Sequence, residues 1–124
     1  MVEIEVANRS GAQLDVDAAA DLIRAVLRDE GIEEGELGLQ LVAPEEIRGL
    51  KHEHLGVDEE TDALAFPIDG REPVPEGLPR QLGDVVLCPQ VVGERWRTPL
   101  VHAVLHLVGY DHGAQMEARE RAHA

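Results

Sequence analysis

The change in apolar spacing along the chain constrains the fold more than any other feature of the sequence. Residues 2–7 alternate apolar and polar side chains, which is the period of a half-buried strand. Residues 19–27 place apolar side chains at the spacing of an amphipathic helix. Asp15 or Asp17 can cap this helix, and Gly31 can end it. The chain therefore begins with a predicted strand followed by a predicted helix.

The same reasoning predicts the remaining elements. Strands are expected at 37–42, 63–68 and 85–88, and helices at 44–50, 99–108 and 114–123. Thr98 is the expected cap of the helix that starts at Pro99. The proline-rich stretch 70–81 is expected to be an exposed connector. The order β-α-β-α-β-β-α-α predicts an α+β fold in one small domain spanning residues 1–124, with a mixed four-stranded sheet packed with helices.

The composition limits both the core and the partners. Phe66, Trp96 and Tyr110 are the only aromatic residues, so the core must consist of aliphatic side chains. Cys88 is the single cysteine, which excludes an intrachain disulfide and a cysteine-rich metal site. The net charge of −14 opposes general nucleic-acid binding, because affinity for phosphates depends on basic side chains. Any RNA site must therefore be local.

The N-terminal residues give an expectation about location. They alternate charged and apolar side chains and lack the apolar stretch of a signal peptide. Elsewhere no apolar run reaches the length of a membrane span. We therefore expect a cytoplasmic protein with no membrane partner.

Three histidines near the C-terminus carry the strongest chemical signal. His102 and His106 are four residues apart on a predicted helix, so their side chains project from one face. Gly109 lets the chain reverse, and His112 can then return towards the same point. Three neutral imidazoles around one open position are a ligand set of catalytic zinc. The alternative, histidines satisfied within the core, is less favourable because two imidazoles on an aliphatic helix would need partners.

The residue after the first histidine excludes one reaction class. The spacing of the three histidines matches that of the metzincin peptidases, which carry a glutamate after the first histidine as general base. Ala103 occupies that position here. Peptide hydrolysis by that mechanism is therefore not expected, and no side chain is assigned as the general base.

Three motifs together resemble one known family. Residues 102–112 read His-Ala-Val-Leu-His-Leu-Val-Gly-Tyr-Asp-His, which is similar to the histidine signature of the YbeY-type endoribonucleases, bacterial rRNA maturation factors. Residues 61–67, Thr-Asp-Ala-Leu-Ala-Phe-Pro, resemble a second family motif. A third is Leu-Gly-Asp-Val-Val-Leu at 82–87. The motifs occur in the family's order, and the resemblance covers most of residues 2–117.

The resemblance implies a function that composition and spacing do not reveal. It implies one Zn²⁺ held by His102, His106 and His112 on the last main helix and the following turn. It also implies cleavage of single-stranded rRNA, including 16S rRNA 3′-end processing, and a role in ribosome quality control. The implied partners are the small ribosomal subunit and its assembly factors. Water or the 2′-hydroxyl of the RNA would then be the nucleophile.

Two alternatives stay open at this point. The first is a ribosome-associated assembly factor whose zinc is structural and whose nuclease activity is weak or absent. The acidic composition favours it, as does Leu55, which stands where many relatives carry an arginine suited to gripping a phosphate. Lys51, Arg48 or Arg71 are the candidates to replace that arginine. The second alternative is a hydrolase that acts on another substrate with the same metal frame.

Three further residues are candidates for contacts with a metal ligand or with substrate. Asp84 follows a glycine near a predicted strand and can hydrogen-bond to a metal-binding histidine, although a turn or capping role competes. Asp111 precedes His112 and can orient water or cap the turn. His54 flanks the position of the missing arginine and can approach RNA, although a solvated helix face is the simpler interpretation.

Overall fold

The computed structural model describes residues 1–55, 63–110 and 113–123. The predicted alternation of strands and helices is present, with two short additional helical turns before the histidine helix. The elements are β1 (Glu3–Asn8), α1 (Val16–Asp29), β2 (Glu36–Leu41), α2 (Pro44–Leu55), β3 (Ala63–Pro67), β4 (Gln81–Leu87), α3 (Pro89–Val92), the 3-10 turn η1 (Gly93–Arg95), α4 (Arg97–Leu107) and α5 (Ala114–Ala122).

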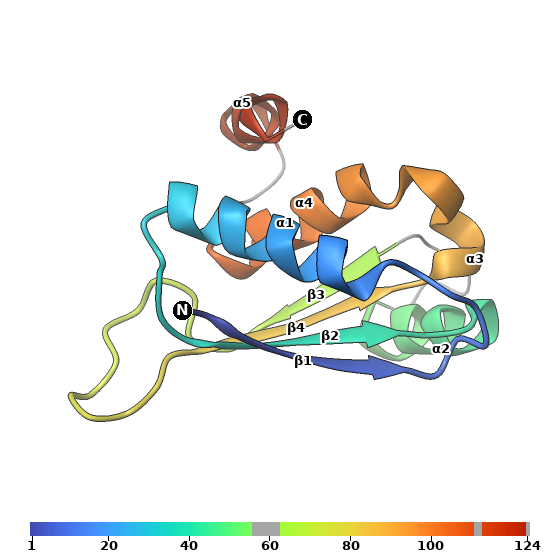
Figure 1. Cartoon of the computed structure of the whole chain (residues 1–124), viewed down its shortest axis with the longest axis horizontal. Helices are drawn as coiled ribbons and strands as arrows, with labels where there is room; N and C mark the ends of the chain where they lie inside the picture. Colours follow the sequence, from blue (N-terminus) through green and yellow to red (C-terminus); the bar gives the residue numbers. More distant parts are fainter. Residues whose placement is uncertain (56–62, 111–112, 124) are drawn as a thin grey trace.

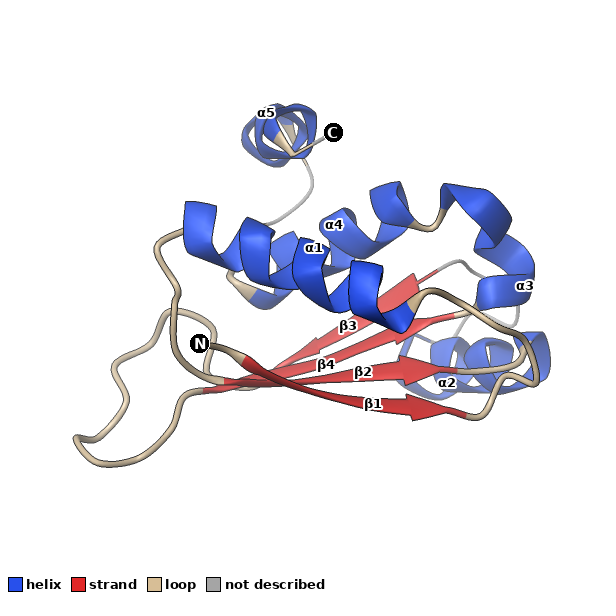
Figure 2. Ribbon diagram, viewed as in Figure 1, coloured by secondary structure: helices blue, strands red, loops and turns tan. Residues whose placement is uncertain are grey.

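The strands form one mixed sheet with the order β1-β2-β4-β3. β1, β2 and β4 run parallel, and β3 pairs antiparallel with β4. Figures 1 and 2 show α1 and α4 on one face of this sheet and α2 on the other. The crossovers between the parallel strands place helices on both faces, which buries the central strands on both sides. The predicted α+β fold with a mixed four-stranded sheet is confirmed.

The core is aliphatic, as the composition requires. Its larger part lies between the sheet and the helices α1 and α4, where the buried residues include Ile23, Leu27, Leu39 and Leu105. A smaller cluster lies under α2 on the other face of the sheet and consists of Val42, Ile47, Val86 and Cys88. The single cysteine is therefore a buried core residue with a free thiol.

β4 begins earlier than the sequence predicts. We expected a connector over 70–81 and a strand only from 85, but β4 starts at Gln81. Gly83 and Asp84 lie inside the strand, where they pair with Pro67 and Phe66 of β3, so the turn or capping role considered for Asp84 does not apply. A Cβ at Gly83 would approach the Phe66 carbonyl oxygen to 2.1 Å, and its φ is +126°. The glycine is therefore required by close strand pairing rather than by a turn.

The start of α4 also differs from the prediction. We expected Thr98 as the cap, but α4 begins at Arg97, and Trp96 occupies the cap position without a side-chain hydrogen bond. The chain enters α4 directly from η1, so the backbone is already helical there. By contrast, Asp15 caps α1 as predicted, since its carboxylate accepts from Ala18 N at 3.0 Å.

α4 is largely buried, yet it spans only 11 residues. Within the ranges that the structure describes, no helix combines the length and the apolarity needed to cross a membrane. α4 packs against β3 and β4 of the sheet and against α1. This arrangement places polar side chains of α4 beside solvent while its apolar side chains contact the sheet.

α5 lies outside the layer formed by α1 and α4 (Figure 1). Met116 is its buried apolar residue, with 1% of its surface exposed. Polar contacts also join α5 to the body of the protein, and two carboxylates, Glu30 and Glu120, take part in them. This docking determines the surroundings of the histidines.

Candidate metal centre

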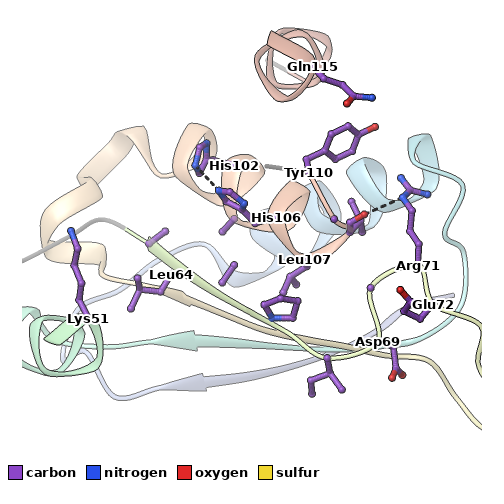
Figure 3. A pocket seen from close by; sticks show the side chains of 18 residues that line it. Lys51, Leu64, Asp69, Arg71, Glu72, His102, His106, Leu107, Tyr110 and Gln115 are labelled. Carbon is purple, nitrogen blue, oxygen red and sulfur yellow. Dashed lines mark hydrogen bonds between the residues drawn. The ribbon is translucent and has the colours of Figure 1, made fainter. Parts of the chain in front are cut away.

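His102 and His106 lie on one face of α4 and approach one another. Their Nε2 atoms are 3.1 Å apart, and the rings meet edge to face with centroids 4.7 Å apart. Figure 3 shows both rings on the side of α4 that borders a cleft. The predicted convergence of the side chains four residues apart is therefore present.

The distance between the two Nε2 atoms fits a shared metal ion. Two nitrogen atoms bound at ordinary lengths to one tetrahedral zinc lie about 3.3 Å apart. The observed separation of 3.1 Å needs only a small adjustment to reach that value. Neutral imidazole nitrogens are also ligands that zinc prefers. Both the geometry and the donor chemistry therefore suit this cation.

The third predicted ligand is His112. His112 and Asp111 lie outside the described residues. Within the described residues, no group of three or more His, Cys, Asp or Glu side chains is arranged to hold a metal ion. The three-histidine site therefore stays a prediction, of which the structure describes two members.

Glu120 of α5 contacts the other nitrogen of the first histidine. Its Oε1 lies 2.5 Å from Nδ1 of His102, and both side chains are partly exposed. A carboxylate at this distance accepts the Nδ1 proton, which leaves the lone pair of the neutral ring on Nε2. Nε2 is the atom that faces His106. A neutral ring with its proton on Nδ1 would therefore present its lone pair on the side that a metal ligand requires.

A cleft of about 1060 Å³ borders the two histidines. Its walls come from α4, β3, the segment after β3 and the end of α2. Lys51 and Arg71 are the basic residues of its lining, and Asp69 and Glu72 are acidic. In Figure 3, Lys51 and Arg71 lie at opposite ends of the cleft with the two histidines between them. An extended anionic chain could therefore meet a positive side chain on either side of the histidines.

The Arg71 side chain already makes hydrogen bonds within the protein. Its Nε donates to the carbonyl oxygen of Val108 at 3.0 Å, and its Nη1 to that of Glu30 at 3.0 Å. Nearly half of its side chain is still exposed. Lys51 lines the cleft from α2, whereas Arg48 is exposed on α2 and is not among the lining residues. Three basic residues were considered above as substitutes for the missing family arginine. Two of them, Lys51 and Arg71, line the cleft.

The remaining sequence candidates lie elsewhere. Asp84 is on the face of β4 opposite α4, where its carboxylate covers Gly38 so closely that a Cβ there would be 2.0 Å from Oδ1. His54 is exposed on α2 and packs edge to face against Phe66, with ring centroids 4.9 Å apart. Leu55 is the last residue of α2. The structure therefore does not bring Asp84 or His54 together with the two histidines.

A second carboxylate, Glu30, lies at the end of α1 with only 3% of its side chain exposed. It accepts hydrogen bonds from Tyr110 Oη at 2.7 Å, Arg119 Nε at 2.8 Å and Arg71 Nη2 at 3.2 Å, and His123 Nε2 lies 3.3 Å away. Burial alone raises the pKa of this carboxyl, but hydrogen bonds from the tyrosine, arginine and histidine hold its pKa below the ordinary value. Glu30 is therefore ionised and ties α5 to the end of α1.

The comparison with known families decides the assignment. The family model described as Endoribonuclease YbeY matches residues 5–123. The chain belongs to the YbeY endoribonuclease family. Proteins named Endoribonuclease YbeY from Salinispora tropica and Rubrobacter xylanophilus are 37% and 36% identical to it. Each alignment covers 96% of this chain, and 88% and 87% of the two relatives. The resemblance predicted from the three motifs is confirmed.

A solved structure supports the fold of this YbeY family member. A solution structure of a Thermotoga maritima protein superposes with a TM-score of 0.59 and covers 99% of this chain and 86% of that chain. The two sequences are 24% identical over the aligned part. At this identity, the likeness concerns the fold alone.

Sequence reasoning missed Glu120 and Glu30. Glu120 is 18 residues from His102 and sits in a helix that carries no apolar stripe. Glu30 lies 89 residues from Arg119, and nothing in its neighbourhood marks it as different from other acidic residues. Both contacts depend on how α5 packs, which local sequence patterns do not reveal.

Proposed function

We propose that this chain is a zinc-dependent endoribonuclease that cleaves single-stranded RNA in rRNA maturation, including 16S rRNA 3′-end processing and ribosome quality control. The observation that carries the proposal is the convergence of His102 and His106 at an open cleft. Its relatives are named for endoribonuclease activity. The small ribosomal subunit and its assembly factors are the proposed partners.

The histidines would hold the metal, and the cleft would hold the RNA. His102 and His106, with His112 as the predicted third ligand, supply the neutral nitrogen donors. When bound, zinc supplies a Lewis acid that acidifies water and polarises a phosphodiester oxygen. Lys51 and Arg71 would attract the backbone phosphates on either side of the scissile bond. These two side chains support a local RNA site in a chain that is otherwise strongly acidic.

A second candidate function rests on that same acidity. With a net charge of −14 and a leucine in place of the family arginine, the chain would bind free RNA weakly. An assembly factor with a structural zinc and little or no nuclease activity would need only a protein or ribosomal docking surface. Zinc content and cleavage must therefore be measured separately.

The test uses four purified proteins: wild type, His106→Ala, His112→Ala and His52→Ala. His52 is an exposed histidine of α2 that does not line the cleft, so its replacement is the matched control. Zinc content is measured by elemental analysis, and cleavage is followed on a single-stranded precursor spanning the 16S rRNA 3′ end. We expect wild type and His52→Ala to contain zinc and cleave, and the other two to lose both properties.

Two results would change the conclusion. Equal cleavage by all four proteins would point to a contaminating nuclease and contradict the proposal. Zinc in wild type without cleavage, together with co-sedimentation with small ribosomal subunits, would favour the assembly factor instead.

A further inference from the structure

α5 places a carboxylate directly behind a predicted metal ligand. The Oε1 atom of Glu120 lies 2.5 Å from Nδ1 of His102, while Nε2 of the same ring lies 3.1 Å from Nε2 of His106. The two nitrogens of one imidazole are therefore used for different purposes. One contacts an acceptor on α5, and the other faces the position where the metal would bind.

The position of Glu120 does not depend on its attraction to the histidine alone. Met116, Arg119, Glu120 and His123 follow the spacing of one helix face. Met116 is buried, and Arg119 and His123 contact Glu30, the residue that follows α1. Because these contacts fix α5, they also place the Glu120 carboxylate beside the His102 ring.

A carboxylate behind a metal-binding histidine has known physical consequences. It accepts the Nδ1 proton, keeps the lone pair on Nε2, limits rotation of the ring and raises the basicity of the ligand. An exposed ion pair on a helix surface would have none of these effects on a metal. The partial burial of both side chains, 35% exposed for His102 and 27% for Glu120, favours a defined geometry over an exposed ion pair.

We propose that Glu120 is a positioning residue for the metal ligand His102, an inference that rests on the proposed zinc site. Glu120 does not contact the metal or the RNA. It acts through the ring, by fixing the tautomer and orientation in which Nε2 and the nitrogen of His106 can bind one cation. α5 thereby becomes part of the metal centre rather than a peripheral helix.

The test compares Glu120→Ala with Glu120→Gln and with Glu117→Ala. Glu117 is an exposed carboxylate on the same helix, so its replacement changes the charge equally without touching the ring. Zinc dissociation constants are measured by competition with a chromophoric chelator, and thermal unfolding is measured on the metal-free proteins. We expect Glu120→Ala to weaken zinc binding about 10- to 100-fold. Glu120→Gln keeps an acceptor and should recover part of this loss, and Glu117→Ala should match wild type.

A second measurement does not depend on any variant. In the zinc-loaded wild type, long-range ¹H–¹⁵N correlation spectra should show the His102 ring protonated at Nδ1 and bound at Nε2. The opposite assignment would overturn the inference. So would zinc affinity in Glu120→Ala equal to that of wild type, or a loss of zinc affinity fully explained by unfolding of the metal-free protein.

The same data separate this inference from the proposed function. If wild type binds zinc and His106→Ala does not, the metal site stands whatever Glu120→Ala shows. If wild type binds no zinc at all, the proposed zinc enzyme fails, and the inference about Glu120 fails with it.

Discussion

Two carboxylates connect α5 to the rest of the molecule, and they differ in their burial and in the number of side chains that they contact. Glu30 has 3% of its side chain exposed. Its carboxylate accepts hydrogen bonds from a tyrosine and two arginines, and a histidine ring nitrogen lies 3.3 Å away. Glu120 has 27% of its side chain exposed and contacts one histidine ring. The first holds the helix in place, and the second uses that placement to reach the candidate metal centre. The comparison separates the stability of α5 from its contribution to the site.

The largest effect is expected from removing the buried carboxylate. Glu30→Ala leaves two arginines, a tyrosine and a histidine without their shared acceptor, and α5 loses its main polar attachment. Removing one partner of a buried ion pair costs about 3–5 kcal/mol. Because Arg71 and Arg119 are 48% and 34% exposed and can turn to water, we expect the lower part of that range. Urea unfolding of the metal-free variant measures the loss, and an unchanged midpoint would contradict the structural role of Glu30.

The next effect concerns coupling between the two carboxylates. If Glu30 acts on the metal only by placing α5, Glu30→Ala should weaken zinc binding by no more than Glu120→Ala does, about tenfold or 1.4 kcal/mol at the lower limit. The double variant should then bind zinc as weakly as Glu120→Ala alone, because one path is lost in each case. Chelator competition on all four proteins of the cycle gives the answer. Additive losses would mean that Glu30 influences the metal by another route.

The elements that the sequence predicts correctly are those with a local signal. The apolar stripe of α1 follows Asp15, whose carboxylate indeed caps the helix. His102 and His106 converge because four residues on a helix span about one turn. In these cases neighbouring residues determine the outcome, so the pattern is sufficient.

The failures have a common cause, which is that distant partners decide them. β4 begins at Gln81 rather than at the predicted residue 85, because Gly83 allows close pairing with Phe66 and Pro67 of β3. The inner face of α5 contains Met, Arg, Glu and His, so no apolar periodicity reveals that it docks. Glu120 reaches His102 because the contacts of Arg119 and His123 with Glu30 hold this face of α5 against the body of the protein. Sequence patterns therefore predict which histidines converge but miss the carboxylates that hold α5 beside them.

Acid should remove the stabilisation that Glu30 provides. The pKa of Glu30 is lower in the folded protein than its ordinary value of 4.5, because the hydrogen bonds outweigh the effect of burial. The stabilisation it provides is therefore present above pH 4.5 and is lost as the pH falls through the lower, folded pKa. The free energy of unfolding of metal-free wild type should fall more steeply below pH 4.5 than that of Glu30→Gln. Parallel curves for the two proteins would contradict the depressed pKa.

The smallest expected effect tests whether the attachment of α5 is specific to one arginine. Arg119 donates two hydrogen bonds to Glu30, whereas Arg121, two residues further on, is exposed. Both changes to glutamine remove one positive charge from α5, so general electrostatics affect them equally. Arg119→Gln removes these charge-assisted bonds, so it should lower the urea midpoint of the metal-free protein, by less than Glu30→Ala does. Arg121→Gln should change stability by less than about 0.5 kcal/mol. Equal losses of stability in urea unfolding would mean that α5 is held by its overall charge. Glu30 would then not be the residue that attaches α5.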